Sequence, residues 1–293
     1  MNQRCRSSML RFCSILLTAA GASGVWAAPA PDANSVLILS STDGGSAYST
    51  EATAQGFTAV VETPANWATY TQADFESFRA IILGDPTCVV GTSPIAAAEA
   101  NRANWSAAVG DGPKIVIGTD EQFHFGQGGA QLIASGISFV TSEPAETGLY
   151  ISLSCYYDST ATGTPVPVLD QFGAFTVGSA GCFNDAHIVA LHPALSGTTD
   201  ASLSNWGCSV HEVFNSFPGA TFIPLAIAEG ATGTGEMSFG DGTSGIPYIL
   251  ASGAGIVPVG EAAAIPTLSL WALALLAVVL GFAALRNFRR TAP

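Results

Sequence analysis

The sequence predicts an α/β domain with a doubly wound, mostly parallel sheet, followed by one transmembrane helix near the C-terminus. Two observations predict the sheet: short apolar runs recur through the first half of the chain, and segments long enough for helices separate them. A third observation predicts the transmembrane helix. Residues 268–285 form an uncharged stretch of 18 residues, which as a helix would span about 27 Å of bilayer.

The first half of the chain alternates predicted strands with predicted helices. Its continuous apolar runs are typical of strands buried on both faces. Thr71 and Asp74 form a plausible helix start. We predict strands at 36–39, 57–61, 80–83 and 114–117, and helices at 48–55, 72–78, 95–109 and 128–135. The second half is less regular, and we predict strands there at 150–155, 188–191, 222–228 and 246–251.

The charges divide the 293 residues into three parts. Six of the nine Lys and Arg residues lie at the two ends, within residues 4–11 and 286–290. The part between them holds Arg79, Arg102, Lys114 and all 22 acidic residues, so its formal charge is −19. Nucleic-acid binding is therefore not expected, because phosphate contacts need Lys and Arg.

The two ends are typical of targeting segments, and they define the domain organisation. A basic start, a short apolar run and small residues predict a signal peptide at 1–27, cut by signal peptidase after Ala27. The exported domain is then 28–252, a Gly/Ala-rich spacer is 253–264, and the tail is 265–293. An uncleaved N-terminal anchor is the alternative to the signal peptide.

The tail combines a short motif, the predicted helix and a basic end. The motif residues are Ile265, Pro266, Thr267, Leu268 and the nearby Trp271. This order resembles the IPTL-type sorting signal of Gram-negative bacteria, from which it departs at Ala272, where the family usually has Gly. The resemblance implies an exosortase-like membrane enzyme that cuts near the motif. The protein would lie transiently in the inner membrane, and then on the cell surface or in the extracellular matrix. A plain tail anchor is the alternative.

Three short segments of the exported domain resemble the class I glutamine amidotransferase-like superfamily, which has a flavodoxin-like sheet. Residues 80–85 look like its third strand, 114–121 like the strand before its nucleophile elbow, and 191–197 contain a similar His-Pro pair. The enzymes of that superfamily need a Cys at the elbow, where this sequence has Asp120. We therefore do not expect glutaminase activity, and enzymatic activity in general is uncertain.

Four residues are candidates for a functional site. Asp120 and His124 follow a predicted parallel strand, at the sheet edge where ligands bind in such folds. His211 and Glu212 belong to the densest polar cluster, which begins at Cys208. A Cys-x-x-His spacing can ligate zinc, and His with Glu can act in acid–base catalysis. The alternative for the second pair is a disulfide beside a buried, hydrogen-bonded histidine.

Four cysteines remain after removal of the signal peptide. They are Cys88, Cys155, Cys182 and Cys208. An even number in an exported chain favours two disulfides, with three connectivities open.

The sequence favours a non-catalytic binding or structural module at the cell surface, with no cofactor and no metal, and it does not identify the ligand. One alternative is a hydrolase-type enzyme that uses Asp120, His124, His211 and Glu212 in one cleft, which a metal ion could assist. Another is a sensor or binding protein that an uncleaved tail keeps in the inner membrane.

Overall fold

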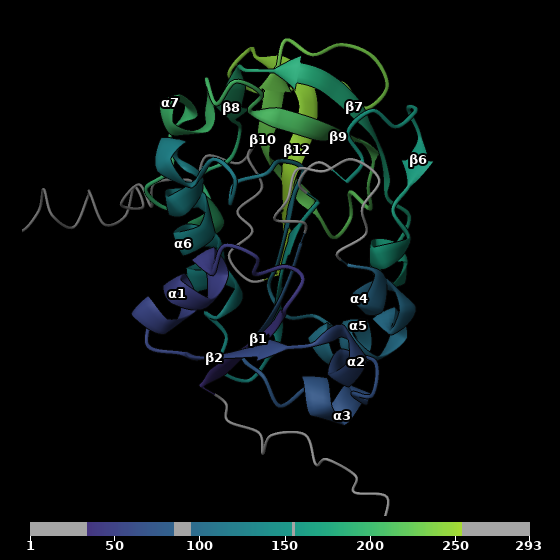
Figure 1. Ribbon diagram of the computed structural model, residues 1–293. Coiled ribbons are helices and arrows are strands. Elements are labelled where there is room, and N and C mark those ends of the chain that lie inside the picture. Colours follow the sequence, from purple (N-terminus) through teal and green to yellow (C-terminus); the bar gives the residue numbers. More distant parts are fainter. Residues whose placement is uncertain (1–33, 85–94, 154–155, 254–293) are drawn as a thin grey trace, which may run out of the picture. The chain divides into compact units, whose positions relative to one another are not determined.

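A computed structural model describes residues 34–84, 95–153 and 156–253 of the chain (Figure 1). These residues form a nine-stranded sheet and a three-stranded sheet. The strand order of the large sheet is β2-β1-β3-β5-β4-β12-β10-β8, and β11 pairs with β12 outside this path. The predicted α/β fold with a large, mostly parallel sheet is therefore confirmed.

Five parallel strands form one half of the large sheet. They are β1 Ser35–Leu39, β2 Thr58–Glu62, β3 Ala80–Gly84, β4 Lys114–Ile117 and β5 Gly148–Ser152. All residues of β1, β3, β4 and β5 are buried, whereas the edge strand β2 is partly exposed. Burial on both faces explains why the apolar runs of the sequence are continuous rather than alternating.

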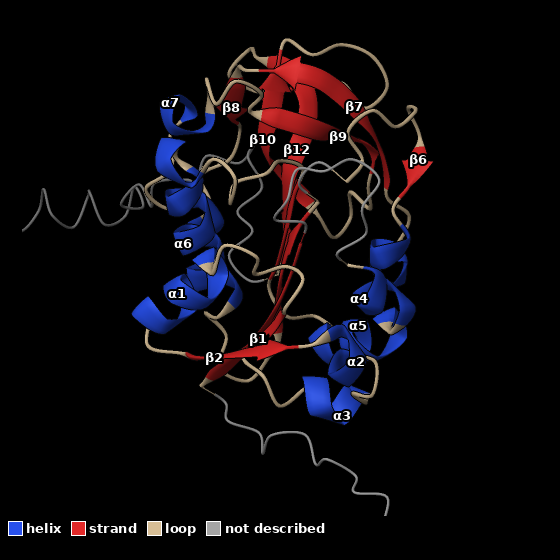
Figure 2. Cartoon of the chain, in the orientation of Figure 1, coloured by secondary structure: helices blue, strands red, loops and turns tan. Residues whose placement is uncertain are grey.

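The position of β5 differs from the flavodoxin-like order, in which the parallel strands run 2-1-3-4-5. Here β5 pairs with both β3 and β4, so it lies between them. The chain reaches β5 from β4 through α6, which runs back over the sheet on the face opposite to α4 and α5 (Figure 2). A right-handed crossover on that face returns the chain toward β3.

Helices cover both faces of the parallel half. Helices α1 Ala47–Ala54 and α6 Gly129–Val140 pack together on one face (Figure 2). The other face carries α2 Pro64–Trp67, α3 Gln72–Phe75, α4 Ala96–Ala100 and α5 Arg102–Val109. The main core cluster lies on the α6 side and takes Val36 and Ile38, alternate residues of β1, together with Ile133 of α6. This arrangement is the doubly wound architecture that the sequence predicts.

Antiparallel strands complete the large sheet. They are β12 Ser244–Ser252, β10 Ile223–Glu229, β8 Ala186–Ile188 and the short β11 Met237–Ser238. The long strand β12 pairs with β4 on one side and β10 on the other. It therefore joins the parallel half to the second half of the chain.

The three-stranded sheet consists of β6 Thr164–Pro165, β7 Thr176–Phe183 and β9 Val210–Ser216. It lies beside the β10–β12 part of the large sheet, and β9 contacts β12 (Figure 1). Helix α7 Asp200–Leu203 and the short 3-10 helices η2 Pro167–Phe172 and η3 Pro193–Leu195 connect the strands of this half. A further 3-10 helix, η1 Phe125–Gln127, lies between β4 and α6 in the parallel half.

Most of the predicted elements are present, with shifted ends. The strand predicted at 114–117 is β4 itself, and Thr71 and Asp74 form a complete capping box at the start of α3. The helix predicted at 95–109 is divided at Asn101 into α4 and α5. The strand predicted at 188–191 ends at Ile188 in β8, because the chain then turns into η3. The sequence did not predict β7 and β9.

Several predictions concern segments outside the described residues. They include the signal peptide at 1–27, the sorting motif and tail at 265–293, Cys88 and Cys155. Within the described segments, no helix is long and apolar enough to cross a membrane. The helix predicted at 268–285 lies outside them. The structure contains a disulfide between Cys182 and Cys208, which is one of the pairings that the sequence left open.

Lys114 is a buried cation at the start of β4. The residue is 4% exposed, and its Nζ donates a hydrogen bond of 2.7 Å to the carbonyl oxygen of Gly112. The Nζ also lies 5.3 Å from the centre of the Phe172 ring. Burial lowers the pKa of Lys114 to about 8.

We expect Lys114→Met to stabilise the domain near pH 7. The lysine of the unfolded chain keeps its proton up to about pH 10.4, so between about pH 8 and pH 10 the unfolded state binds more protons. The free energy of unfolding of the wild type should therefore rise with pH over this range, and that of Lys114→Met should lack this contribution. At pH 7 the variant should be more stable by about 1–3 kcal/mol. Urea unfolding at pH 7 and pH 9.5 checks both, and equal pH dependences for the two proteins would contradict the prediction.

Candidate functional site

The candidate site begins at the carboxyl end of β4, where the loop 118–124 leaves the large sheet. Gly118 lies at the point where this loop meets two other strands. Its N–H donates to the carbonyl oxygen of Tyr248 at 2.7 Å, and its carbonyl oxygen accepts from the N–H groups of His211 (3.2 Å) and Glu212 (3.1 Å). These hydrogen bonds hold β9 of the small sheet against the end of β4. They bring two segments of the chain together that are about ninety residues apart.

The contact at Gly118 requires a glycine. A Cβ atom on this residue would lie 2.3 Å from the backbone oxygen of Glu212, far closer than real Cβ atoms approach a backbone atom. The glycine is thus needed for the close approach of β4 and β9.

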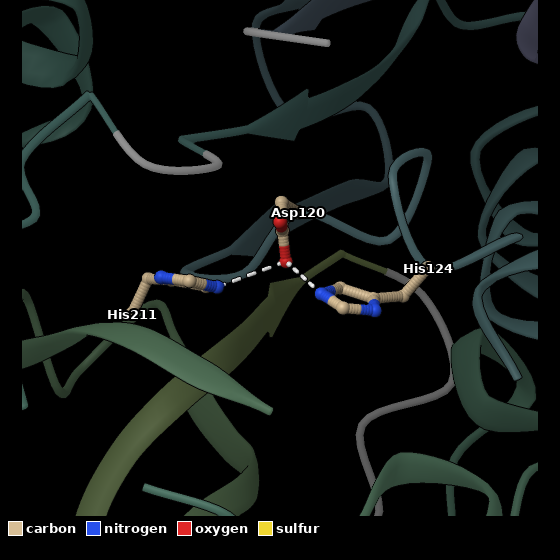
Figure 3. Close-up of side chains that lie close together, drawn as sticks. All are labelled: Asp120, His124 and His211. Atoms are coloured by element: carbon tan, nitrogen blue, oxygen red, sulfur yellow. Dashed lines mark ion pairs between the residues drawn. The ribbon is translucent and has the colours of Figure 1, made fainter. Parts of the chain in front are cut away.

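Three of the four predicted site residues converge beyond this contact. The Oδ1 atom of Asp120 lies 3.0 Å from Nε2 of His211 and 3.4 Å from Nε2 of His124 (Figure 3). The candidate ligand atoms of the three side chains all lie within 4.8 Å of one another. The side chain of Asp120 is 1% exposed, and those of His124 and His211 are 11% and 8% exposed. The carboxylate and the two imidazoles therefore form one almost buried polar cluster, which we call the Asp–His–His cluster.

Some polar atoms of this cluster lack a hydrogen-bond partner among the described residues. The 3.0 Å contact between Asp120 and His211 lacks hydrogen-bond geometry. Within the part of the chain that the structure describes, Oδ2 of Asp120 and Nε2 of His211 have no hydrogen-bond partner. A buried polar atom without a partner is costly, so such atoms often mark functional sites.

His124 is fixed in orientation by its surroundings. Its Nδ1 lies 2.6 Å from Oε1 of Gln127, and Nε2 of the same amide donates to the carbonyl oxygen of Asn205 at 3.5 Å. The imidazole stacks on Trp206, with ring centres 5.3 Å apart. The Phe123 ring contacts it edge-on at 5.2 Å. The ring is thus held by one polar and two aromatic neighbours.

The disulfide supports the same region from the other side. It joins Cys182, in β7, to Cys208, in the loop before β9, with Cα atoms 4.6 Å apart. This loop carries Trp206, whose backbone N–H donates a hydrogen bond of 3.1 Å to the hydroxyl oxygen of Ser209. The covalent link therefore restrains the loop that packs against His124.

Glu121 lies next to Asp120 but takes part in a separate buried network. Its carboxylate accepts hydrogen bonds from the hydroxyls of Tyr48 (2.8 Å), Tyr150 (2.7 Å) and Ser152 (2.8 Å). Burial raises the pKa of Glu121, although these hydrogen bonds oppose the shift. The network ties the loop after β4 to α1 and β5, and it fixes the backbone from which Asp120 projects.

Glu212, the fourth predicted candidate, is not one of the three converging residues. Its Oε1 accepts a hydrogen bond of 2.8 Å from the backbone N–H of Tyr157. Burial raises its pKa well above the usual value for a glutamate. Among the described residues its Oε2 has no hydrogen-bond partner. Glu212 therefore follows His211 in the sequence but binds the backbone of Tyr157 instead of joining the Asp–His–His cluster.

A groove of about 720 Å³ opens close to the cluster. It is lined by the β1–α1 loop, including Gly45 and Ser46, and by Gln122, Phe123 and Phe125. Phe123 and Phe125 are 66% and 48% exposed. Asp120, His124 and His211 do not line it, so the groove and the Asp–His–His cluster are neighbours rather than one cavity.

Sequence reasoning missed two residues that shape the site, Gln127 and Trp206. Gln127 lies in a Gly-rich segment, Gly126 to Gly129, that suggests a phosphate loop but lacks the lysine of one. Its distance of three residues from His124 is the signal that could have identified it, since such residues meet on one turn. Nothing in the sequence links Trp206 to His124.

The comparison with known protein families found a match in the tail. The IPTL-CTERM motif matches residues 263–290. No match to the chain was found among curated proteins or among solved structures. The motif match supports the sorting-signal prediction, and with it an exported bacterial protein that is sorted to the cell surface. The resemblance of the exported domain to the amidotransferase-like superfamily stays a prediction.

We expect Gly118→Ala to destabilise the domain, because the added methyl group would force β9 away from β4. Such overpacking typically costs about 1–3 kcal/mol of unfolding free energy. Urea unfolding followed by circular dichroism measures the loss. Gly126→Ala is the matched control, since a Cβ there meets nothing within 4 Å. Equal stability of the two variants would show that the contact at Gly118 does not constrain the fold.

Proposed function

We propose that the protein is exported, processed at its C-terminal tail and displayed at the cell surface, where its α/β domain acts as a binding module. The observation that carries the first part is the match of the IPTL-CTERM motif to residues 263–290. In this proposal, signal peptidase cuts after Ala27, and residues 268–285 span the inner membrane until an exosortase-like enzyme cuts near the motif.

The distribution of charge supports the same route. Arginines flank the predicted membrane helix on its C-terminal side, at Arg286, Arg289 and Arg290. The positive-inside rule keeps these residues in the cytoplasm and so places the acidic domain outside the inner membrane. The near absence of cations in that domain argues against anionic partners such as nucleic acids.

The Asp–His–His cluster supports the second part, a binding role. Asp120 and His124 lie beyond the carboxyl end of β4, at the sheet edge where ligands bind in open α/β folds. Where the amidotransferase-like enzymes have a nucleophilic cysteine, this chain has Asp120, and Cys182 and Cys208 are joined in a disulfide. A carboxylate is a poor acyl nucleophile, which argues against glutaminase chemistry.

The convergence of Asp120, His124 and His211 also favours a second candidate, a hydrolase-type enzyme. A carboxylate that contacts an imidazole can orient it as a general base toward water. The hydrolase predicts substrate turnover that Asp120→Asn abolishes, whereas the binding module predicts ligand binding without turnover.

The sorting step is tested with the double variant Pro266→Ala/Thr267→Ala, produced in a bacterium that has an exosortase-like enzyme. The wild type should reach the surface of intact cells in a shortened form, as detected by antibody labelling and mass. The double variant should stay in the inner membrane at greater mass, because the processing enzyme no longer recognises the tail. Thr291→Ala, one residue beyond the matched segment, is the control and should behave as the wild type. Surface display of the double variant at the mass of the wild type would refute the proposal.

A further inference from the structure

We propose that Asp120, His124 and His211 bind one divalent first-row transition-metal ion, with Zn²⁺ as the type case, through Oδ1 of the aspartate and Nε2 of each histidine. This inference rests on the proposed role of the Asp–His–His cluster as a binding site. It departs from the expectation from sequence that the domain holds no metal.

The spacing of the ligand atoms fits a single tetrahedral ion. Zn–N and Zn–O bonds are about 2.0–2.1 Å, so two neighbouring ligand atoms of a tetrahedral ion lie about 3.3 Å apart. The two measured distances from Asp120 Oδ1, 3.0 Å to His211 and 3.4 Å to His124, lie on either side of this value. The ligand atoms of all three residues lie within 4.8 Å of one another, so the remaining distance, between the two histidine nitrogens, also allows one tetrahedral ion.

The hydrogen bonds of the Gln127 side chain set the tautomer of His124. The Gln127 amide donates through Nε2 to Asn205, so its Oε1 faces Nδ1 of His124 as an acceptor. The proton of a neutral His124 must therefore be on Nδ1, and Nε2 presents a lone pair to the carboxylate of Asp120. Two acceptors 3.4 Å apart repel each other unless a cation lies between them.

Cationic side chains are scarce in the exported domain. Asp120 is buried, and a buried carboxylate needs a compensating charge. The sequence has no Lys or Arg from Ile115 to Leu285. Of the three in the exported domain, Arg102 pairs with Asp170, and Lys114 and Arg79 donate to the backbone oxygens of Gly112 and Thr141. A metal ion would supply the charge that these side chains do not bring to Asp120.

The surroundings of His124 fit a metal ligand. Metal-binding histidines almost always donate their second ring N–H to an oxygen atom, which fixes the ring and its tautomer. Gln127 accepts this hydrogen bond at 2.6 Å, and Trp206 stacks on the ring. The ligand is thus oriented before any ion binds, as in other preorganised sites.

The ligand set selects the class of ion. Two imidazoles and one carboxylate suit Zn²⁺ and its neighbours in the first transition row, whereas Ca²⁺ takes six to eight oxygen ligands and Mg²⁺ prefers oxygen and water. With three protein ligands, a tetrahedral ion keeps a fourth position open for water or a bound molecule. The competing explanation is a protonated His124 or His211 that pairs with Asp120 without a metal.

The test uses untagged full-length protein, purified in detergent and stripped with a chelator, because a histidine tag would itself bind metal. Isothermal titration with Zn²⁺ should give one site per chain, and Co²⁺ should produce visible absorption bands of a tetrahedral complex. Ca²⁺ should give neither signal. Either the absence of Zn²⁺ binding to the wild type or equal binding of Ca²⁺ would overturn the proposal, and the absence of binding would favour the protonated pair.

The variants locate the site. His124→Ala and His211→Ala should each weaken Zn²⁺ binding at least tenfold, and Gln127→Ala should weaken it about 10–100-fold through loss of the hydrogen bond to His124. His192→Gln is the matched control, since this histidine precedes η3 as its N-cap and contacts Phe139 instead. Undiminished binding in the cluster variants would place the zinc elsewhere and refute the proposal. Because Gln127 is exposed, its variant keeps the test decisive if a histidine variant fails to fold.

The outcomes separate this inference from the proposed sorting. Zinc binding is measured on purified protein and does not depend on the tail. A chain that reaches the surface but binds no Zn²⁺ refutes the metal site alone. A chain that binds Zn²⁺ but is not displayed refutes the sorting proposal alone.

Discussion

The contact of Gly118 with β9 joins the two halves of the exported domain at the place where the polar cluster forms. On one side is a parallel sheet built by local βαβ units, and on the other a set of antiparallel strands built from the second half of the chain. One carbonyl oxygen, that of Gly118, accepts from two consecutive N–H groups of β9. Asp120 and His124 come from the first half and His211 from the second. The cluster therefore exists only when both halves are folded and docked.

The small number of Lys and Arg residues determines which groups surround the buried acids near this contact. Asp120, Glu121 and Glu212 are all buried within the same region, and each carboxylate is accommodated differently. Glu121 has three hydroxyl donors, Glu212 has one backbone donor, and Asp120 has two imidazoles. In a domain with more Lys and Arg, such acids would form ion pairs. Here the polar neighbours of these acids are hydroxyls, a backbone amide and histidines.

The sequence predicted the parallel half well, because the residues of buried parallel strands form continuous apolar runs such as 114–117. It missed β7 and β9, because Gly178, Ser179 and Gly181 interrupt the apolar residues of β7, and both strands depend on partners distant in sequence. Position after a strand was enough to select Asp120 and His124, and local polar density selected His211. Their meeting in one cleft was an alternative that the sequence could not establish, because it depends on the crossing of β9 over Gly118. The same density suggested Glu212, which instead binds the backbone of Tyr157.

The link between Cys182 and Cys208 has a consequence for when the domain matures. Disulfides form in oxidising compartments and not in the reducing cytoplasm. The link closes a segment of the chain that contains α7 and Trp206, and this segment packs against His124. In an exported chain this disulfide forms only after translocation. The newly made polypeptide therefore crosses the membrane before the disulfide restrains the segment next to the polar cluster. Maturation of the domain is in this way tied to its arrival in the compartment where it works.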